Sequence, residues 1–134
     1  MGSWGVLPFE NDDALDWVWE LEDAEDFAVL ELSLEQVARA EPDEYVEAAD
    51  AEEALAAAEV VAALLGKPLE ELPEPVEDFL QRNQGKKPDA ERVRLAVKAV
   101  KRIQNSSELK ELWEASDDAE KWDEVIEELL ARLR

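Results

Sequence analysis

The chain of 134 residues is 46% hydrophobic and 7% aromatic, which is enough apolar material for one folded domain over residues 1–134. It has neither cysteine nor histidine, which excludes disulfides, thiolate metal sites, cysteine nucleophiles and the commonest general base. The net charge is −22, and residues 1–60 contain nineteen acidic residues and one basic residue, Arg39. Such a charge repels nucleic acid and favours a basic protein as partner.

Nothing in the sequence indicates a targeting or membrane segment. No basic stretch precedes an apolar one near the start of the chain, and the longest apolar run, VVAALLG, is too short to span a bilayer. We therefore expect no signal peptide, no membrane association and a cytoplasmic protein.

Residues 11–23, NDDALDWVWELED, predict the first helix. Asn11 is a favourable N-cap, and the acidic residues that follow it meet the positive end of the helix dipole. Helical spacing places four apolar residues on one buried stripe: Ala14, Trp17, Val18 and Leu21. Asp16, Glu20 and Asp23 line the opposite face, and Trp19 lies beside them at the edge of the apolar arc.

The next stretch, FAVLELS over residues 27–33, is compatible with either an extended or a helical conformation. Ser33 followed by Gln36 resembles a capping box, and Pro42 stops whatever follows. This pattern predicts a short helix at about residues 34–40.

The clearest predicted element is a helix at about residues 51–65, within DAEEALAAAEVVAALLGKP. Asp50 is expected to cap its start, and Gly66 occupies the position where a left-handed residue ends a helix. The helix is alanine-rich and apolar on nearly every side, with Glu52 and Glu59 on one narrow strip. Because a helix of this kind is normally surrounded by other helices, we expect it at the centre of the fold.

In the second half of the chain, Pro73 and Pro75 are expected to break any helix, and a short helix is predicted over residues 76–83. Helical spacing then predicts three more helices, within residues 89–105, 106–116 and 117–134. The inward-facing residues of the second of these are expected to be Leu109, Leu112 and Trp113. We predict an all-α, compact single-domain bundle of about six to seven helices around the alanine-rich helix.

The start of the chain carries a specific pattern of glycine, aromatic, asparagine and aspartate residues, namely Gly2, Trp4, Gly5, Phe9, Asn11, Asp12, Ala14, Asp16 and Trp17. This pattern resembles the W-G-x-x-x-F-x-N-D signature of a bacterial family known as domain of unknown function 4259. The resemblance extends to the alanine-rich helix and to SSELKELWEAS at residues 106–116, so it covers most of the chain. It implies a short, acidic, mainly helical protein, and it transfers no catalytic residue.

Within this signature, Trp4, Phe9, Asn11, Asp12 and Trp17 are interpreted as structural residues. Gly2 and Gly5 give the backbone freedom, so that Trp4 and Phe9 can pack beside Trp17 as an aromatic plug at the N-terminal end of the bundle. The alternative is that the same three aromatic residues line a ligand pocket.

The sequence contains no convincing reaction centre. Pairs of carboxylates such as Asp12 with Asp16, or Glu52 with Glu59, arise by chance in a chain with 36 acidic residues. A di-iron bundle needs histidine, and Asp16 stands where an EF-hand loop starting at Asn11 would need glycine. Ser106 and Ser107 lack an activating histidine or lysine, so we expect them to cap a helix. We predict no metal, no cofactor and no catalytic residue.

Basic residues concentrate in one segment, where Arg94, Lys98 and Arg102 share a helical stripe. Such a stripe is able to contact phosphates. The overall negative charge opposes direct nucleic-acid binding, so we favour a solvated face that balances nearby acids.

Two classes of function stay open. The one we favour is a non-catalytic protein-binding module, such as an immunity, antitoxin-like or inhibitory partner of a basic protein, whose binding surface consists of Trp19, Asp16, Glu20 and Asp23. The alternative is a small enzyme that uses carboxylates alone or an unrecognised pocket. A deep polar pocket with perturbed pKa values would favour the enzyme, whereas an exposed tryptophan on an acidic face would favour binding.

Overall fold

The computed structural model of the protein describes residues 5–24 and 27–134. Within these residues the chain forms seven α-helices and no β-strand, which confirms the predicted all-α fold. No helix in the described ranges is both long and apolar enough to cross a membrane. The helices are α1 (Asp12–Glu22), α2 (Ala28–Ala38), α3 (Ala48–Leu64), α4 (Glu74–Arg82), α5 (Ala90–Asn105), α6 (Glu108–Glu114) and α7 (Ala119–Leu133).

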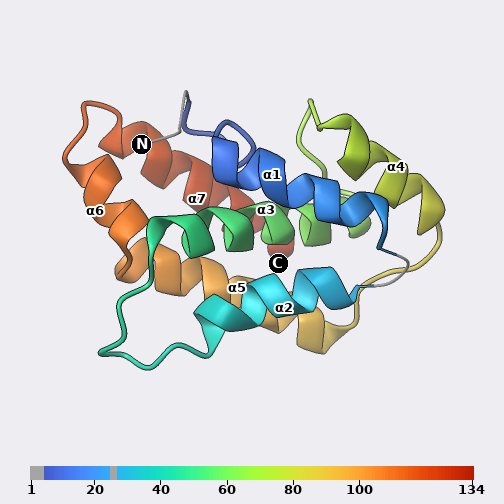
Figure 1. The fold of residues 1–134 in the computed structure, drawn as a ribbon, viewed down its shortest axis with the longest axis horizontal. Coiled ribbons are helices and arrows are strands. Elements are labelled where there is room, and N and C mark those ends of the chain that lie inside the picture. Colours follow the sequence, from blue (N-terminus) through green and yellow to red (C-terminus); the bar gives the residue numbers. More distant parts are fainter. Residues whose placement is uncertain (1–4, 25–26) are drawn as a thin grey trace.

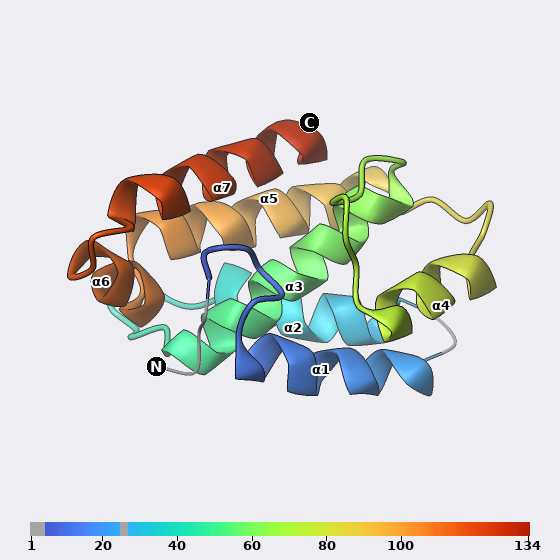
Figure 2. The ribbon, with the colours of Figure 1, turned by 90° about the horizontal axis from the view of Figure 1, so that it is seen from above.

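The alanine-rich helix α3 is the centre of the fold, as the sequence predicts. It runs through the middle of the bundle in Figure 1 and packs against each of the other six helices. Seen from above, α1 and α4 lie on one side of α3, whereas α5 and α7 lie on the other (Figure 2). Buried apolar side chains from all seven helices form one core cluster. The alanines of α3 allow the neighbouring helices to approach it closely, because alanine has almost no side-chain bulk.

The start of α3 differs from the prediction that Asp50 caps it. The N-cap is Glu47, which makes no side-chain capping bond, and Asp50 lies within the first turn. The amide of Ala48 instead donates to a carboxylate oxygen of Glu108 in α6, at 2.7 Å, and the amide of Glu108 donates back to the carbonyl of Val46, at 2.9 Å. A residue sixty positions further along the chain therefore satisfies this helix end.

The end of α3 follows the prediction. Gly66 has a φ of +87°, a left-handed conformation that glycine adopts without the steric cost of a Cβ atom. The amide of Lys67 donates to the carbonyl of Ala62, at 3.0 Å, and the amide of Gly66 donates to the carbonyl of Ala63, at 2.9 Å. This pair of bonds is a Schellman motif, which satisfies the last carbonyls of the helix.

Helix α2 starts earlier than the predicted start at about residue 34, because residues 28–33 are helical. Ser33 does not cap a helix. Its side chain is buried within α2, and its hydroxyl accepts a hydrogen bond from the indole Nε1 of Trp17, at 2.7 Å. The serine thus satisfies the polar atom of a buried tryptophan instead of a helix end.

Three other local predictions can be compared with the structure. Pro75 lies inside the first turn of α4, where its missing amide would have had no partner, so it does not break the helix. Ser107 caps α6 as expected, accepting from the amide of Lys110 at 3.0 Å. The prediction that Leu112 faces inward is wrong, because α6 is a short helix that buries Leu109 and Trp113 and leaves Leu112 37% exposed.

The central position of α3 gives a stability prediction for Leu55, which is 2% exposed. Replacing Leu55→Ala should lower the free energy of unfolding by about 2–5 kcal/mol, because the change removes buried methyl groups and leaves a cavity. Leu32→Ala on α2 is the matched control, since Leu32 is 67% exposed and should cost little. Urea unfolding of both variants measures the difference, and an equal, small cost for the two would contradict the central placement of α3.

Candidate functional site

The outward face of α1 carries all four residues that the sequence predicts as a binding surface. Asn11 starts the helix by accepting from the amide of Ala14, at 2.7 Å, which confirms the predicted N-cap. This start directs Ala14, Trp17, Val18 and Leu21 into the core. Trp19 is 59% exposed on the other side, and the remaining three residues of the surface are exposed with it: Asp16, Glu20 and Asp23. We call these four residues the α1 surface.

Negative charge on this side of the molecule extends beyond α1. Burial raises the pKa of Glu53 on α3, and the charges of Asp50, Glu20 and Asp13 add to the rise. The negative charges of these three residues therefore disfavour the ionised form of Glu53. Burial is the main cause of the raised pKa of Glu53, and the neighbouring carboxylates of α1 and α3 contribute to it.

Within the part of the chain that the structure describes, no lysine or arginine forms an ion pair with a carboxylate of α1. No lysine or arginine precedes Arg39 in the sequence. Arg82 of α4 does approach α1, but it donates to the backbone carbonyls of Leu21 and Ala24, at 2.5 and 3.3 Å. It therefore satisfies the C-terminal end of α1 and leaves the acidic face without a partner.

The residues of the N-terminal signature have separate roles in the structure. Phe9 and Trp17 are buried, 7% and 2% exposed, whereas Asp12 is exposed in the first turn of α1. Trp4 lies outside the described residues, so the aromatic plug as a whole stays a prediction. Asn11 is buried and links three segments, because its side-chain amide donates to the carbonyl of Pro8, at 3.0 Å, and to Oε2 of Glu52, at 2.5 Å. An aspartate could cap the helix but could not donate these bonds.

Glu52, which the sequence analysis treats as one of a chance pair, is a buried acid with a specific hydrogen-bond partner. It is 6% exposed, and burial raises its pKa to about 8, with the negative charge of Asp13 adding to the rise. Its carboxyl is therefore mostly protonated at neutral pH, which is how a buried acid next to a neutral amide avoids the cost of an unpaired charge.

Glu59, one heptad further along α3, is fully buried and is held differently. Arg132 of α7 donates to both of its carboxylate oxygens, at 2.8 Å each, and also donates to the carbonyl of Lys67, at 3.2 Å. Burial raises the pKa of Glu59, and the hydrogen bonds and charge of Arg132 oppose that rise. The sequence signal that could have indicated the burial of both glutamates is their position in an otherwise apolar helix.

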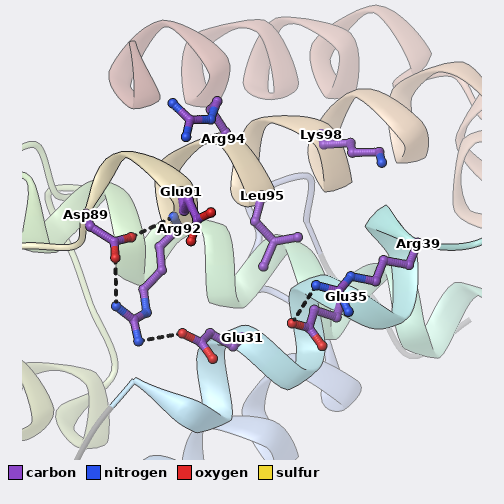
Figure 3. A pocket seen from close by; sticks show the side chains of 9 residues that line it. All are labelled: Glu31, Glu35, Arg39, Asp89, Glu91, Arg92, Arg94, Leu95 and Lys98. Atoms are coloured by element: carbon purple, nitrogen blue, oxygen red, sulfur yellow. Dashed lines mark hydrogen bonds and ion pairs between the residues drawn. The ribbon is translucent and has the colours of Figure 1, made fainter.

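A hollow of about 490 Å³ lies between α2 and α5 (Figure 3). Figure 3 shows Arg92 reaching from α5 towards Glu31 and Asp89, with which it forms ion pairs of 2.5 and 3.4 Å. Arg94 points away from them, to the other side of α5. The lining combines four acidic and four basic side chains with one leucine: Glu31, Glu35, Arg39, Asp89, Glu91, Arg92, Arg94, Leu95 and Lys98.

The three residues of the predicted basic stripe on α5, Arg94, Lys98 and Arg102, do not form one continuous basic surface. Arg102 leaves it, because its guanidinium donates to the carbonyls of Ala40, Glu41 and Glu44, at 2.9, 3.0 and 2.6 Å. This arginine fastens the loop between α2 and α3 to α5. Arg94 and Lys98 stay exposed, so they do not form a converging anion site with Arg102.

Among the described residues, no group of three or more acidic side chains is placed to hold a metal ion. The fold and the α1 surface define a small, acidic, all-α protein with an unpaired carboxylate face. The model of the family called domain of unknown function (DUF4259) matches residues 2–125 of the chain, so the chain belongs to this family. Neither the curated proteins nor the solved structures contain a significant match to the chain.

The buried carboxyl of Glu52 predicts a specific pH dependence of stability. Its pKa is about 8 in the folded chain and near its ordinary value of 4.5 when unfolded, so the folded state holds the proton between these values. The stability that Glu52 contributes is therefore complete below about pH 4.5 and is lost as the pH rises to about 8. Glu52→Gln keeps a carbonyl oxygen for Asn11 and removes this loss, which is on the order of a few kcal/mol.

Unfolding free energies of the wild type and of Glu52→Gln, measured from pH 5 to pH 9, test this expectation. The difference between the two should grow with pH in favour of the glutamine variant. Glu22→Gln, at the exposed end of α1, is the matched control and should leave the wild-type pH profile unchanged. Parallel profiles for the wild type and Glu52→Gln would show that Glu52 does not titrate as described.

Proposed function

We propose that the protein is a non-catalytic protein-binding module that engages a basic protein through the α1 surface, as an immunity, antitoxin-like or inhibitory protein does. The observation that carries the proposal is the 59% exposure of Trp19 on a helix face that also exposes Asp16, Glu20 and Asp23. A tryptophan is costly to leave in water and is among the residues most enriched at the energetic centres of protein interfaces.

The unpaired carboxylates support a basic partner. Since no cation of the described chain forms an ion pair with the acids of α1, a lysine or arginine from a partner would find acceptors that are already free. Such a cation would also relieve the mutual repulsion that contributes to the raised pKa of Glu53. Long-range attraction by these charges would accelerate the encounter, and Trp19 would slow dissociation.

The alternative of a carboxylate enzyme receives less support from the geometry. A catalytic carboxyl is expected in a cleft and with a perturbed pKa. The carboxyls with raised pKa values are those of Glu52, Glu53 and Glu59, and none of them lines the five best-formed hollows of the described residues. Glu52 and Glu59 are instead hydrogen-bonded inside the bundle, where a substrate does not reach them.

The test compares Trp19→Ala with Leu32→Ala, an exposed apolar residue on α2, as immobilised baits in an extract of the source organism. A basic protein that the wild type and Leu32→Ala retain should be lost or strongly reduced with Trp19→Ala. Its association rate with the wild type should fall steeply as salt rises through about 0.15 M, because exposed charges are screened over about 8 Å at that ionic strength.

Unfolding of Trp19→Ala provides the control, because an exposed side chain should contribute little to stability. A flat salt response, or equal retention of the partner by Trp19→Ala and the wild type, would refute binding through the α1 surface. A large loss of stability in this variant would mean that Trp19 supports the fold instead.

A further inference from the structure

A second surface on a different part of the molecule has the features of a binding groove. Two hollows, of about 420 and 260 Å³, share the lining residues Leu7, Leu69 and Glu71, so they adjoin each other, and we treat the two together as one depression. Figure 2 looks down on this region, where the segment before α1 lies beside the loop that leads into α4. No described residue of α1 lines either hollow. We call this depression the Leu7 groove.

The floor of the Leu7 groove is apolar and includes Leu7, which lies in a hydrogen-bonded turn. Leu7 is 42% exposed, and the turn that carries it is closed by the amide of Glu10, which donates to the carbonyl of Leu7, at 3.0 Å. The carboxylate of Glu10 folds back to accept from the amide of Leu7, at 3.2 Å. Gly5 permits this, since an added Cβ there would lie 2.5 Å from Oε1 of Glu10. The opposite wall is Leu69 with Leu72.

The rim of the groove is acidic. Glu10, Glu70, Glu71 and Glu128 surround the apolar floor, and the one cation in the lining is Arg132. That arginine is already engaged by the carboxylates of Glu59 and Glu128. Glu70 and Glu71 are exposed and form no ion pair among the described residues. A ligand would therefore meet a leucine-lined floor between uncompensated negative charges.

We propose that the Leu7 groove binds a short segment of another protein in which apolar side chains are flanked by lysine or arginine. The apolar side chains would cover Leu7 and Leu69, and the basic ones would pair with Glu70 and Glu71. The same rim repels nucleic acid and anionic lipid headgroups. A second copy of this chain is disfavoured as the occupant, because each copy has a net charge of −22.

The probe for this proposal is the fluorescein-labelled peptide KKLPLKK, with KKSPSKK and EELPLEE as matched peptides that lack the leucines or the positive charge. Fluorescence anisotropy with the full chain should show tighter binding of KKLPLKK than of either control. When KKLPLKK is added, the chemical-shift changes of the protein's backbone amides should concentrate in residues 5–10 and 67–73. Leu7→Ser and Glu71→Lys should each weaken binding roughly tenfold, as expected for central interface residues.

Leu32→Ser and Glu22→Lys are the control variants, because they change an exposed leucine and an exposed acid elsewhere, and they should leave the affinity unchanged. Thermal unfolding confirms that each variant is folded. Equal binding of KKLPLKK and KKSPSKK would show attraction by charge alone and would overturn the proposal, as would shift changes confined to α1. Self-association of the wild type that Leu7→Ser abolishes would assign the groove to a second copy instead. Because the α1 surface is tested with Trp19→Ala, the two proposals fail separately.

Discussion

Two buried glutamates of the central helix connect the beginning and the end of the chain to its middle. Glu52 accepts a hydrogen bond from Asn11, which starts α1, and Glu59 is held by Arg132 near the end of α7. The two acids are seven residues apart, so they lie on one face of α3. Most of the other buried side chains of this helix are small and apolar. A polar group buried this deeply must keep its partner, so each glutamate fixes the position of a helix as well as contributing to stability.

The acids of the protein therefore fall into two sets, those buried inside the bundle and those exposed on its surface. Inside the bundle, Glu52 is neutralised by a proton and Glu59 by an arginine. On the surface, the carboxylates of α1 and those of Glu70 and Glu71 in the Leu7 groove form no ion pair among the described residues. The N-terminal segment links the two regions, because Asn11 positions α1 through Glu52 while the turn just before it presents Leu7.

Much of the fold could be predicted because local signals determine it. Asn11 caps α1 and Gly66 ends α3 through bonds within a few residues, and helical spacing identifies the buried stripe around Trp17. Two of the predictions failed because a distant residue takes over a local role. Glu108 satisfies the start of α3, and Trp17 uses the hydroxyl of Ser33. The exposed residues of the α1 surface could be predicted because helix periodicity is a local signal. The burial of Glu59 could not, because its partner Arg132 is distant in sequence.

The central claim, that buried glutamates of α3 hold the ends of the chain, is tested most directly by a double-mutant cycle on Glu59 and Arg132. Unfolding free energies would be measured for Glu59→Met, Arg132→Met and the double variant. Arg132→Met should cost about 3–5 kcal/mol, because it leaves a buried carboxylate without its partner. The double variant should recover much of this loss, since methionines can fill the space without a buried charge. A cost below about 1 kcal/mol for Arg132→Met, typical of a surface ion pair, or costs that simply add, would contradict the account.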